Sequence, residues 1–412
     1  MRCSWLMVVP ALACTPVDDA PSVARVVDAA VLGTLDGPMA WNPDLGPEWR
    51  PDNVEPPPAA EGDGQRPAAA EAGPDADVDA TRPPATADAP PGPTGPRITR
   101  WPVARRVVIV SVDGLRADAL STLRVPTFDA LRREGASTLN ARTDPGRTVT
   151  LPNHTCMITS RPTDGPDGHG FTGNGVTDAT LHEIHGSYVA SLFDVAHDRG
   201  LHTAMVAAKP KFSLYGNSYD AAHGAPDLEP PDDGPAKLDV ALIEAYDDDA
   251  TLGHALELLA GGRTEVIFIH WHECDSAGHS TGFNPAAGTP YAAAVERQDA
   301  RLGRLRAALD PDTALVVTTD HGGSGYGHSD PALREHYTIP FLVAGPGVAA
   351  GADLYALNAG QRAEPGIARA AEDEPPPIRN CEAGNLALSL LNLPPIPGSV
   401  IGRAALHLRW GR

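Results

Sequence analysis

The stretch Val107-Val108-Ile109-Val110-Ser111-Val112-Asp113-Gly114 decides the fold. Its continuous β-branched run is typical of a strand buried on both faces of a parallel sheet. Four more apolar runs have the same character, at residues 203–207, 266–271, 314–319 and 339–344. Helical patterns occupy residues 126–134, 187–199, 238–259 and 291–309. Strands alternating with helices of this length predict an α/β fold: a three-layer sandwich whose central sheet is largely parallel and covered on both faces.

The first hundred residues differ in composition from the rest of the chain. Residues 15–100 are crowded with Pro, Ala, Asp, Glu and Gly and contain few large apolar side chains. Such a segment cannot bury enough apolar surface to offset the entropy of ordering it, so we expect a disordered linker. The catalytic domain is then expected at residues 101–412, with a surface loop or lid at 209–237, where Gly, Pro and Asp are frequent.

The extreme N-terminus has the features of an export signal. Arg2 precedes an apolar run from Trp5 to Ala13, which ends at Cys14. The run is too short to span a bilayer as a helix, but it fits the charged start and apolar core of a secretory signal. Its last residues resemble a bacterial lipoprotein signal, in which the cysteine is lipidated. We therefore expect residues 1–14 to direct export to the periplasm, the outer envelope or the exterior, with membrane contact only through a lipid at Cys14. The alternative is a misassigned start codon ahead of a structureless tail.

Charge and cysteine content exclude some classes of function. The formal net charge is −21, from 53 acidic and 32 basic residues. This balance argues against a nucleic-acid partner bound through a broad basic surface. The five cysteines form no CxxC pair and no regular spacing, so a disulfide framework is not supported. We expect Cys156 and Cys274 to be buried free thiols.

Three of the apolar runs lead into residues that can bind a metal. The first ends at Asp113, the third leads to Asp275 and His279, and the fourth ends at Asp320-His321. In open α/β sheets, ligands bind beyond the carboxyl ends of the strands. Carboxylate and imidazole together suit zinc or a similar divalent cation. A single strand-end aspartate is more often a helix cap or a turn residue, but three strands that deliver acid and imidazole to one edge favour a metal site.

The segment Thr148-Val149-Thr150-Leu151-Pro152-Asn153-His154 is a candidate for the nucleophile. Pro152 is suited to the first position of a helix. Thr150 would then lie at a helix N-terminus, where free N–H groups and the helix dipole favour an anion such as phosphate. Threonine is a poor nucleophile unaided, and a divalent metal can activate it. The alternative is that Thr148 or Thr150 only caps the helix.

Together these motifs resemble the type I phosphodiesterase/nucleotide pyrophosphatase branch of the alkaline phosphatase superfamily. The resemblance runs from about residue 105 to the C-terminus and rests on five segments in the family order. They are Val-Asp113-Gly-Leu-Arg, Thr150-Leu-Pro-Asn-His, Gly168-His-Gly-Phe-Thr-Gly-Asn174, Asp275-Ser-Ala-Gly-His279 and Thr-Asp320-His321-Gly-Gly. It implies an alkaline phosphatase-like fold that carries two divalent metal ions, most readily Zn, with Mn as the alternative.

The resemblance also implies the roles of individual residues. Asp113, Asp320 and His321 would hold one metal with the Thr150 hydroxyl. Asp275 and His279 would hold the other, completed by a later histidine. We predict His328 for that position, with His336 as the alternative. In nucleotide pyrophosphatases proper this histidine comes much later in the chain, so a nucleotide substrate is not implied.

Three neighbouring groups have weaker signals. Asn174 resembles the asparagine that donates to a phosphoryl oxygen in the family, although Gly173-Asn174-Gly175 also reads as a turn. Lys209 and Lys211 follow a strand and are candidates for phosphate contacts, but lysines beside a Pro-rich loop are usually solvated. His169, His270 and His272 are expected to support the metal ligands rather than to bind metal.

The expected activity is hydrolysis of a small-molecule phosphate ester, a diester or a monoester, through a phosphothreonine at Thr150. A phosphotransferase would use the same residues. A sulfatase shares the fold but needs a modifiable Cys or Ser in a CxPxR-like context, which Thr150-Leu151-Pro152-Asn153 does not supply. A non-catalytic metal-binding surface protein and an unrelated structural α/β protein are the remaining alternatives.

Overall fold

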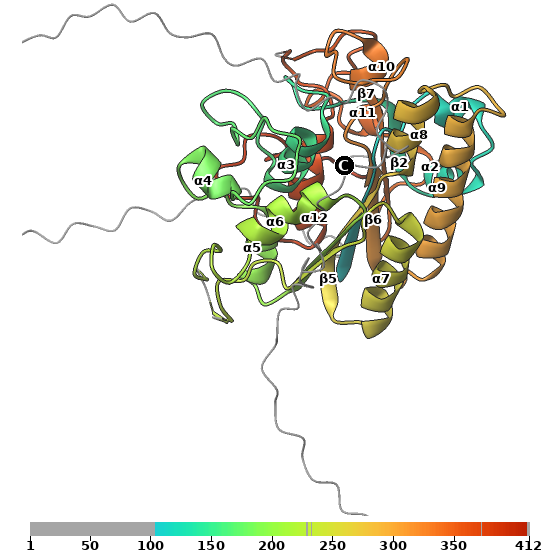
Figure 1. Ribbon diagram of the computed structural model, residues 1–412. Helices are drawn as coiled ribbons and strands as arrows, with labels where there is room; N and C mark the ends of the chain where they lie inside the picture. Colours follow the sequence, from blue (N-terminus) through green and yellow to red (C-terminus); the bar gives the residue numbers. More distant parts are fainter. Residues whose placement is uncertain (1–103, 228–229, 232, 372, 410–412) are drawn as a thin grey trace, which may run out of the picture.

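The computed structural model describes residues 104–409, except residues 228, 229, 232 and 372 (Figure 1). The predicted export signal at 1–14, Cys14 and the predicted linker at 15–100 lie outside the described residues. Within the described part of the chain, no helix has the length and apolar character needed to cross a membrane.

The described residues form one central sheet of eight strands, in the order β4-β3-β5-β1-β6-β7-β2-β8. The strands are β1 (Arg106–Val112), β2 (Ala136–Arg142), β3 (His202–Ala207), β4 (Val240–Ile243), β5 (Thr264–Trp271), β6 (Thr313–Thr318), β7 (Thr338–Ala344) and β8 (Ala352–Asp353). β1 pairs in parallel with β5 and β6, and β3 pairs in parallel with β4 and β5. Only β7 runs against its neighbours β6 and β2. The predicted, largely parallel sheet is confirmed.

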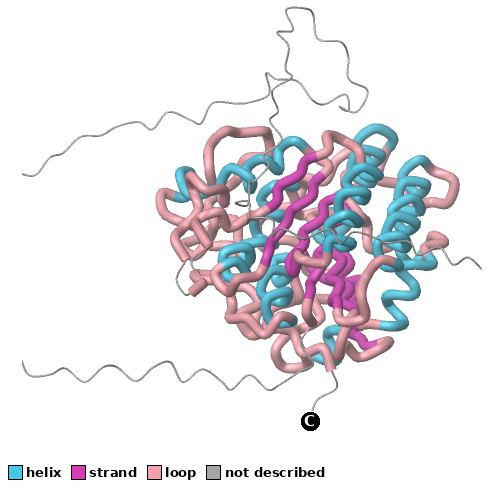
Figure 2. The backbone as a smooth tube through the Cα atoms, turned by 90° about the horizontal axis from the view of Figure 1, so that it is seen from below, coloured by secondary structure: helices cyan, strands magenta, loops and turns pink. Residues whose placement is uncertain are grey.

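Helices cover both faces of this sheet, as Figures 1 and 2 show. The longer helices of one layer are α3 (Thr150–Thr159), α5 (Leu192–His197), α6 (Ser213–Ser218) and α12 (Ala383–Leu390). Those of the other are α2 (Pro126–Glu134), α7 (Asp248–Gly261), α8 (Glu273–Thr281) and α9 (Pro290–Ala307). The short helices are α1 (Ala119–Thr122), α4 (Leu181–His185), η1 (Pro210–Phe212), α10 (Arg334–Tyr337), α11 (Leu354–Leu357) and η2 (Asn380–Glu382).

The alternation of β1 side chains explains why one run of residues can serve two cores. Val107 and Ile109 belong to the core beneath α3, α5 and α12, whereas Val108 and Val110 belong to the core beneath α2, α7 and α9. All four side chains are completely buried. Successive residues of a strand point to opposite faces, so an apolar residue is required at every position of this central strand.

The structure corrects three of the predicted elements. Residues 238–259 are not one helix: β4 pairs with β3, and α7 begins only after Asp247, which caps it with its side chain. The helix predicted at 187–199 is restricted to α5, because Ser191 and Asp194 form a capping box at its start. The predicted loop at 209–237 begins with η1 and α6, because Phe212 and Tyr215 are buried in the core instead of lying on the surface.

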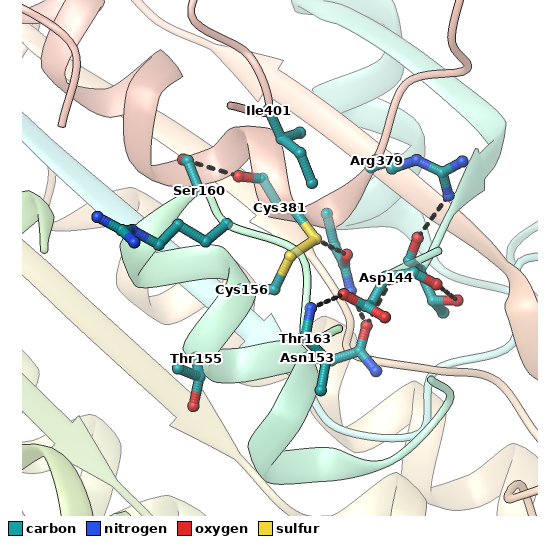
Figure 3. The surroundings of a disulfide bond; sticks show 12 residues. Asp144, Asn153, Thr155, Cys156, Ser160, Thr163, Arg379, Cys381 and Ile401 are labelled. Carbon is teal, nitrogen blue, oxygen red and sulfur yellow. Dashed lines mark hydrogen bonds between the residues drawn. A yellow bond between two sulfur atoms is a disulfide. The ribbon is translucent and has the colours of Figure 1, made fainter. Parts of the chain in front are cut away.

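A disulfide joins Cys156 of α3 to Cys381 of η2 (Figure 3). The expectation that Cys156 is a free thiol is therefore wrong. Cys274 is a buried free cysteine, as predicted. The two cysteines are 225 residues apart in the sequence, so no local spacing pattern could have predicted their pairing. It links the helix that carries the candidate nucleophile to the C-terminal segment of the chain.

Candidate active site

The carboxyl ends of the three central strands bring the predicted ligand residues to one edge of the sheet. β5, β1 and β6 are adjacent. Asp113 follows β1 directly, Asp275 lies on α8 just after β5, and Asp320 is the second residue after β6. Asp113 and Asp320 are fully buried and Asp275 is 4 % exposed. The sheet order therefore explains how residues more than 200 positions apart meet.

The first group of potential metal ligands consists of Asp113, Asp320 and His321. His321 Nε2 lies 3.5 Å from Asp113 Oδ1 and 3.2 Å from Asp320 Oδ2. His321 Nδ1 is 2.9 Å from the Gly322 carbonyl oxygen, which only accepts, so Nδ1 carries the hydrogen and Nε2 keeps its lone pair. This is the arrangement of a neutral imidazole that is ready to bind a metal.

The second group consists of Asp275, His279 and His328. Asp275 Oδ1 lies 3.3 Å from His279 Nε2 and 3.7 Å from His328 Nε2. The Nδ1 atoms of both histidines lie against backbone carbonyl oxygens, at 2.8 Å from Tyr326 O and 2.7 Å from Thr148 O. Both Nε2 lone pairs are thus left for a metal. The rings of His328 and His321 stack at 3.5 Å, so the two groups adjoin.

His336, the alternative to His328, has a different environment. Its Nε2 lies 2.8 Å from Ser324 Oγ. It belongs to none of the potential metal-binding groups found among the described residues, whereas His328 lies with Asp275 and His279. The geometry favours His328.

Unpaired polar atoms gather where the two groups meet. Asp113 Oδ1, Asp275 Oδ1, Asp320 Oδ2 and His321 Nε2 are buried and have no hydrogen-bond partner in the described part of the chain. Buried polar atoms are almost always paired, so four unpaired acceptors in adjacent residues favour a cation at this place. Carboxylate oxygens and imidazole nitrogens are the donors that zinc accepts. The residues present therefore fit two divalent cations.

Lys209 supplies one positive charge at this place. Its Nζ lies 2.7 Å from Asp113 Oδ2 and 2.6 Å from Asp275 Oδ2, and the residue is 5 % exposed. The expectation of a solvated lysine is wrong, because the end of β3 directs the side chain between two buried carboxylates. Burial alone would raise the pKa of Asp113, but the Lys209 ammonium and the nearby histidines hold it well below its ordinary value.

A single lysine does not neutralise three buried carboxylates. Burial, followed by the charge of Asp113, raises the pKa of Asp320 well above its ordinary value. In the absence of metal, one of the carboxylates is therefore poorly compensated. The uncompensated negative charge and the unpaired oxygen atoms thus occur on the same carboxylates.

Thr150 is the first residue of α3 and is 1 % exposed. The helix begins two residues before the predicted start at Pro152, which occupies its third position. Val149 precedes the helix and has no polar side chain to cap it. The side chain of Asn174 caps the helix instead, because its Oδ1 accepts from the Leu151 N–H at 3.1 Å. The same Oδ1 also accepts from Lys211 Nζ at 3.0 Å. Since Oδ1 is engaged, the amide NH₂ is the end of Asn174 that can donate to a substrate.

His154 fixes the start of α3 against the sheet. Its Nδ1 lies 2.8 Å from the Thr150 carbonyl oxygen, and its Nε2 lies 2.8 Å from Ser111 Oγ on β1. The same Nδ1 is 3.7 Å from Asp320 Oδ2. The backbone of Thr150 is therefore held beside the first group of potential ligands.

Of the three histidines expected to support the ligands, only His270 contacts one. Its Nδ1 accepts from the Ala208 N–H at 3.4 Å, so Nε2 donates to Asp113 Oδ2 at 3.0 Å. His169 contacts the Pro152 carbonyl oxygen at 3.2 Å, and His272 contacts Ser276 Oγ at 2.9 Å.

The comparison with known proteins agrees with this geometry. The profile of the family described as Type I phosphodiesterase / nucleotide pyrophosphatase matches residues 107–332, which is more than half of the chain. Human ectonucleotide pyrophosphatase / phosphodiesterase 5 shares the fold with a TM-score of 0.50 and 15 % sequence identity, over 73 % of this chain and 99 % of that chain.

Some curated relatives match over a shorter stretch. The phosphopentomutase of Edwardsiella ictaluri is 38 % identical over 104 residues, which is 25 % of this chain and 23 % of that protein. The phosphopentomutase of a Methylobacterium species is 46 % identical over 107 residues, 26 % of this chain and 25 % of that protein. The match thus spans about a quarter of the length of these relatives.

The family match, the alkaline phosphatase-like sheet and the clustered acid and imidazole groups have a common explanation. The chain belongs to the type I phosphodiesterase / nucleotide pyrophosphatase family, within the alkaline phosphatase superfamily.

Proposed function

We propose that this protein hydrolyses small phosphoric esters with two divalent metal ions, Zn or alternatively Mn, through a phosphothreonine at Thr150. The observation that carries the proposal is the set of unpaired buried atoms on Asp113, Asp275, Asp320 and His321. One of them, Asp320 Oδ2, lies 3.7 Å from His154 Nδ1, which also contacts the Thr150 carbonyl oxygen at 2.8 Å at the start of α3. What supports a metal site is that these four acceptors belong to neighbouring acid and imidazole groups.

The two groups of ligands divide between the two cations. Asp113, Asp320, His321 and the Thr150 hydroxyl would hold one. Asp275, His279 and His328 would hold the other. When bound, such ions lower the pKa of a coordinated hydroxyl or water and offset negative charge on the transferring group.

The reaction then proceeds as a double displacement at phosphorus. Thr150 Oγ attacks phosphorus in line while the bond to the leaving oxygen breaks, and Thr150 becomes phosphothreonine. A water oxygen next attacks phosphorus, the bond to Thr150 breaks, and phosphate or a phosphomonoester is released. The NH₂ group of Asn174 and the positive end of α3 stabilise charge on the phosphoryl oxygens.

Phosphoryl transfer to an acceptor other than water is the second candidate. The local similarity to phosphopentomutases favours it, although that similarity covers about a quarter of each protein. Release of inorganic phosphate from p-nitrophenyl phosphate in equal amount to nitrophenol supports hydrolysis. Nitrophenol without free phosphate, in the presence of a sugar acceptor, supports transfer.

The disulfide supports the expected export. Structural disulfides persist mainly in oxidising compartments such as the periplasm and the exterior. We accordingly propose that the protein works outside the cytoplasm. The lipid at Cys14 stays a prediction, because it falls outside the described residues.

The decisive experiment compares p-nitrophenyl phosphate with bis-p-nitrophenyl phosphate as substrates of protein whose metal content has been measured. We expect zinc-dependent turnover of one or both, and a loss of roughly 10³-fold or more in kcat for Thr150→Ala. Thr155→Val is the matched control: Thr155 is a buried threonine of the same helix, and its hydroxyl contacts only Leu151 O and Tyr215 Oη among the described residues. Full, chelator-sensitive activity in Thr150→Ala would rule out the phosphothreonine.

A further inference from the structure

Asn153 ties the segment before the nucleophile to the helix that begins with it. Its Nδ2 donates to the carbonyl oxygens of Arg147, at 3.0 Å, and Val149, at 3.1 Å. Its Oδ1 accepts from the Asp144 N–H at 2.8 Å and from Asn380 Nδ2 at 3.0 Å. The side chain is completely buried, so these bonds are not exchanged for water. The position of Thr150 thus depends on what holds Asn153.

Asn380 connects this arrangement to the first group of ligands. Its Nδ2 also lies 3.2 Å from the Thr319 carbonyl oxygen and 3.3 Å from the Asp320 carbonyl oxygen. One buried amide group therefore contacts both the side chain that orders the nucleophile segment and the backbone of the Asp320 ligand.

The disulfide holds Asn380 in this place. Cys381, the next residue, is bonded to Cys156 in the middle of α3, with 4.8 Å between their Cα atoms (Figure 3). Ser160, the residue that ends α3, donates from its hydroxyl to the Cys381 carbonyl oxygen at 2.9 Å. The short η2 is thus attached to α3 by a covalent bond and a hydrogen bond, and Asn380 cannot move away from the helix independently.

We propose that Asn380 is a positioning residue: it sets the nucleophile helix against Asp320 and His321, and the Cys156–Cys381 disulfide locks it there. The inference rests on the function proposed above. A shift of the helix relative to Asp320 would change the distance between the Thr150 hydroxyl and the ligands that share its cation. Groups that orient metal ligands without binding the metal typically contribute 10–100-fold to metal affinity or activity.

The test compares Asn380→Ala with Asn385→Ala. Asn385 is an equally buried asparagine five residues later, and its side chain bonds to Ser399, Ile396 and Ile401 and to none of the predicted ligands. Zinc is titrated into metal-free protein by calorimetry, and kcat and KM are measured on the better nitrophenyl ester. For Asn380→Ala we expect about 10–100-fold weaker binding at one of the two zinc sites and a comparable loss in kcat, with KM within about twofold. Wild-type zinc affinity and kcat in Asn380→Ala, or the same losses in Asn385→Ala, would overturn the proposal.

The double variant Cys156→Ala/Cys381→Ala provides a second test that keeps Asn380, and it decides the matter if Asn380→Ala does not fold. We expect the same two losses, smaller than in Asn380→Ala, because the hydrogen bonds remain while the covalent lock is gone. A folded double variant with unchanged zinc affinity and unchanged kcat would contradict the role of the disulfide. If wild-type protein hydrolyses neither ester, the proposed function fails, whereas the zinc titration still decides whether Asn380 positions the ligands.

Discussion

Two clusters of acidic side chains in this protein are each built around one buried lysine. The strand-end cluster comprises Asp113, Asp275, Asp320, His279, His321, His328 and Lys209. The loop cluster comprises His197, Asp198, Asp227 and Lys237. In both, a lysine pairs with two carboxylates: Lys209 with Asp113 and Asp275, and Lys237 with Asp198 and Asp227. By residue types alone, both would be candidates for metal binding.

Their hydrogen bonds differ. Asp227 Oδ1 faces Lys237 and His197, and its Oδ2 accepts from the N–H groups of Asp233 and Gly234 at 2.9 and 3.1 Å. Among the described residues, none of the buried side-chain atoms without a partner belongs to the loop cluster, whereas four belong to the strand-end cluster. Lys237 therefore completes the loop cluster, whereas Lys209 leaves polar atoms of the strand-end cluster unpaired. Unpaired atoms, rather than acidic composition, therefore separate a proposed metal centre from a structural ion pair.

Replacing one carboxylate in each cluster should have the largest effect and the clearest contrast. Asp275→Asn removes a group that lies between both sets of ligands, and we expect kcat to fall by at least about 10³-fold. Asp227→Asn should leave kcat within about threefold, because the loop cluster takes no part in the reaction. Ester hydrolysis at saturating zinc measures both. Equal losses of activity in the two variants would contradict the distinction.

Replacing each lysine tests which cluster lacks positive charge. Removing one partner of a buried ion pair destabilises a protein by about 3–5 kcal/mol, so Lys209→Met and Lys237→Met should each lower the free energy of unfolding by that amount in metal-free protein. Added zinc should restore the stability of Lys209→Met, since a cation replaces the ammonium between Asp113 and Asp275. It should not restore Lys237→Met. Denaturant unfolding with and without zinc measures both, and restoration of the two variants alike would argue against a specific site.

Zinc should also stabilise the unmodified protein, to a smaller extent. A ligand that binds only the folded state at 100 times its Kd adds about 2.7 kcal/mol to the free energy of unfolding. We expect this increment in wild type and in Asp227→Asn, and a smaller one in Asp275→Asn. Removal of the metal with EDTA should reverse it. Loss of the increment in Asp227→Asn would place the metal in the loop cluster instead.

A histidine outside both clusters provides a separate effect, which is seen only in acid. Burial lowers the pKa of His169 to about 3. The unfolded state therefore binds the proton more readily, and the stability contributed by neutral His169 is complete above about pH 6.5 and is lost as the pH falls towards 3. We expect the free energy of unfolding of wild type to fall relative to that of His169→Gln by about 1.4 kcal/mol per pH unit in this window. Parallel pH profiles of the two proteins would show that His169 does not titrate in this way.

The parts of the fold that depend on neighbouring residues in the sequence, such as buried strands and the residues at their ends, could be predicted. The run Val107–Val112 indicated a central strand, and the structure confirms the five predicted strands and the layered α/β architecture. The strand-end rule also selected Asp113 and Asp320, and the structure brings them together with His321. Their role as metal ligands stays a prediction.

The remainder depends on contacts between distant segments. Lys209 follows β3, as Asp113 follows β1, but its burial is decided by two carboxylates from other strands, while the prolines beside it suggested exposure. Cys156 and Cys381 show no spacing that would pair them. Val240–Ile243 is a half-buried edge strand of four residues, too short to be distinguished from the helix after it. Each error concerns a residue or element whose state is set by tertiary neighbours.

The long separation of the two bonded cysteines has a consequence for how the protein is made. During synthesis, every predicted ligand up to His328 leaves the ribosome before Asn380 and Cys381 have been added. Cys156 has no partner until 225 further residues exist. A nascent chain therefore contains the ligands without the bond that fixes α3 to η2. On the inference above, full activity is therefore reached late, after Cys381 has been added and oxidised together with Cys156.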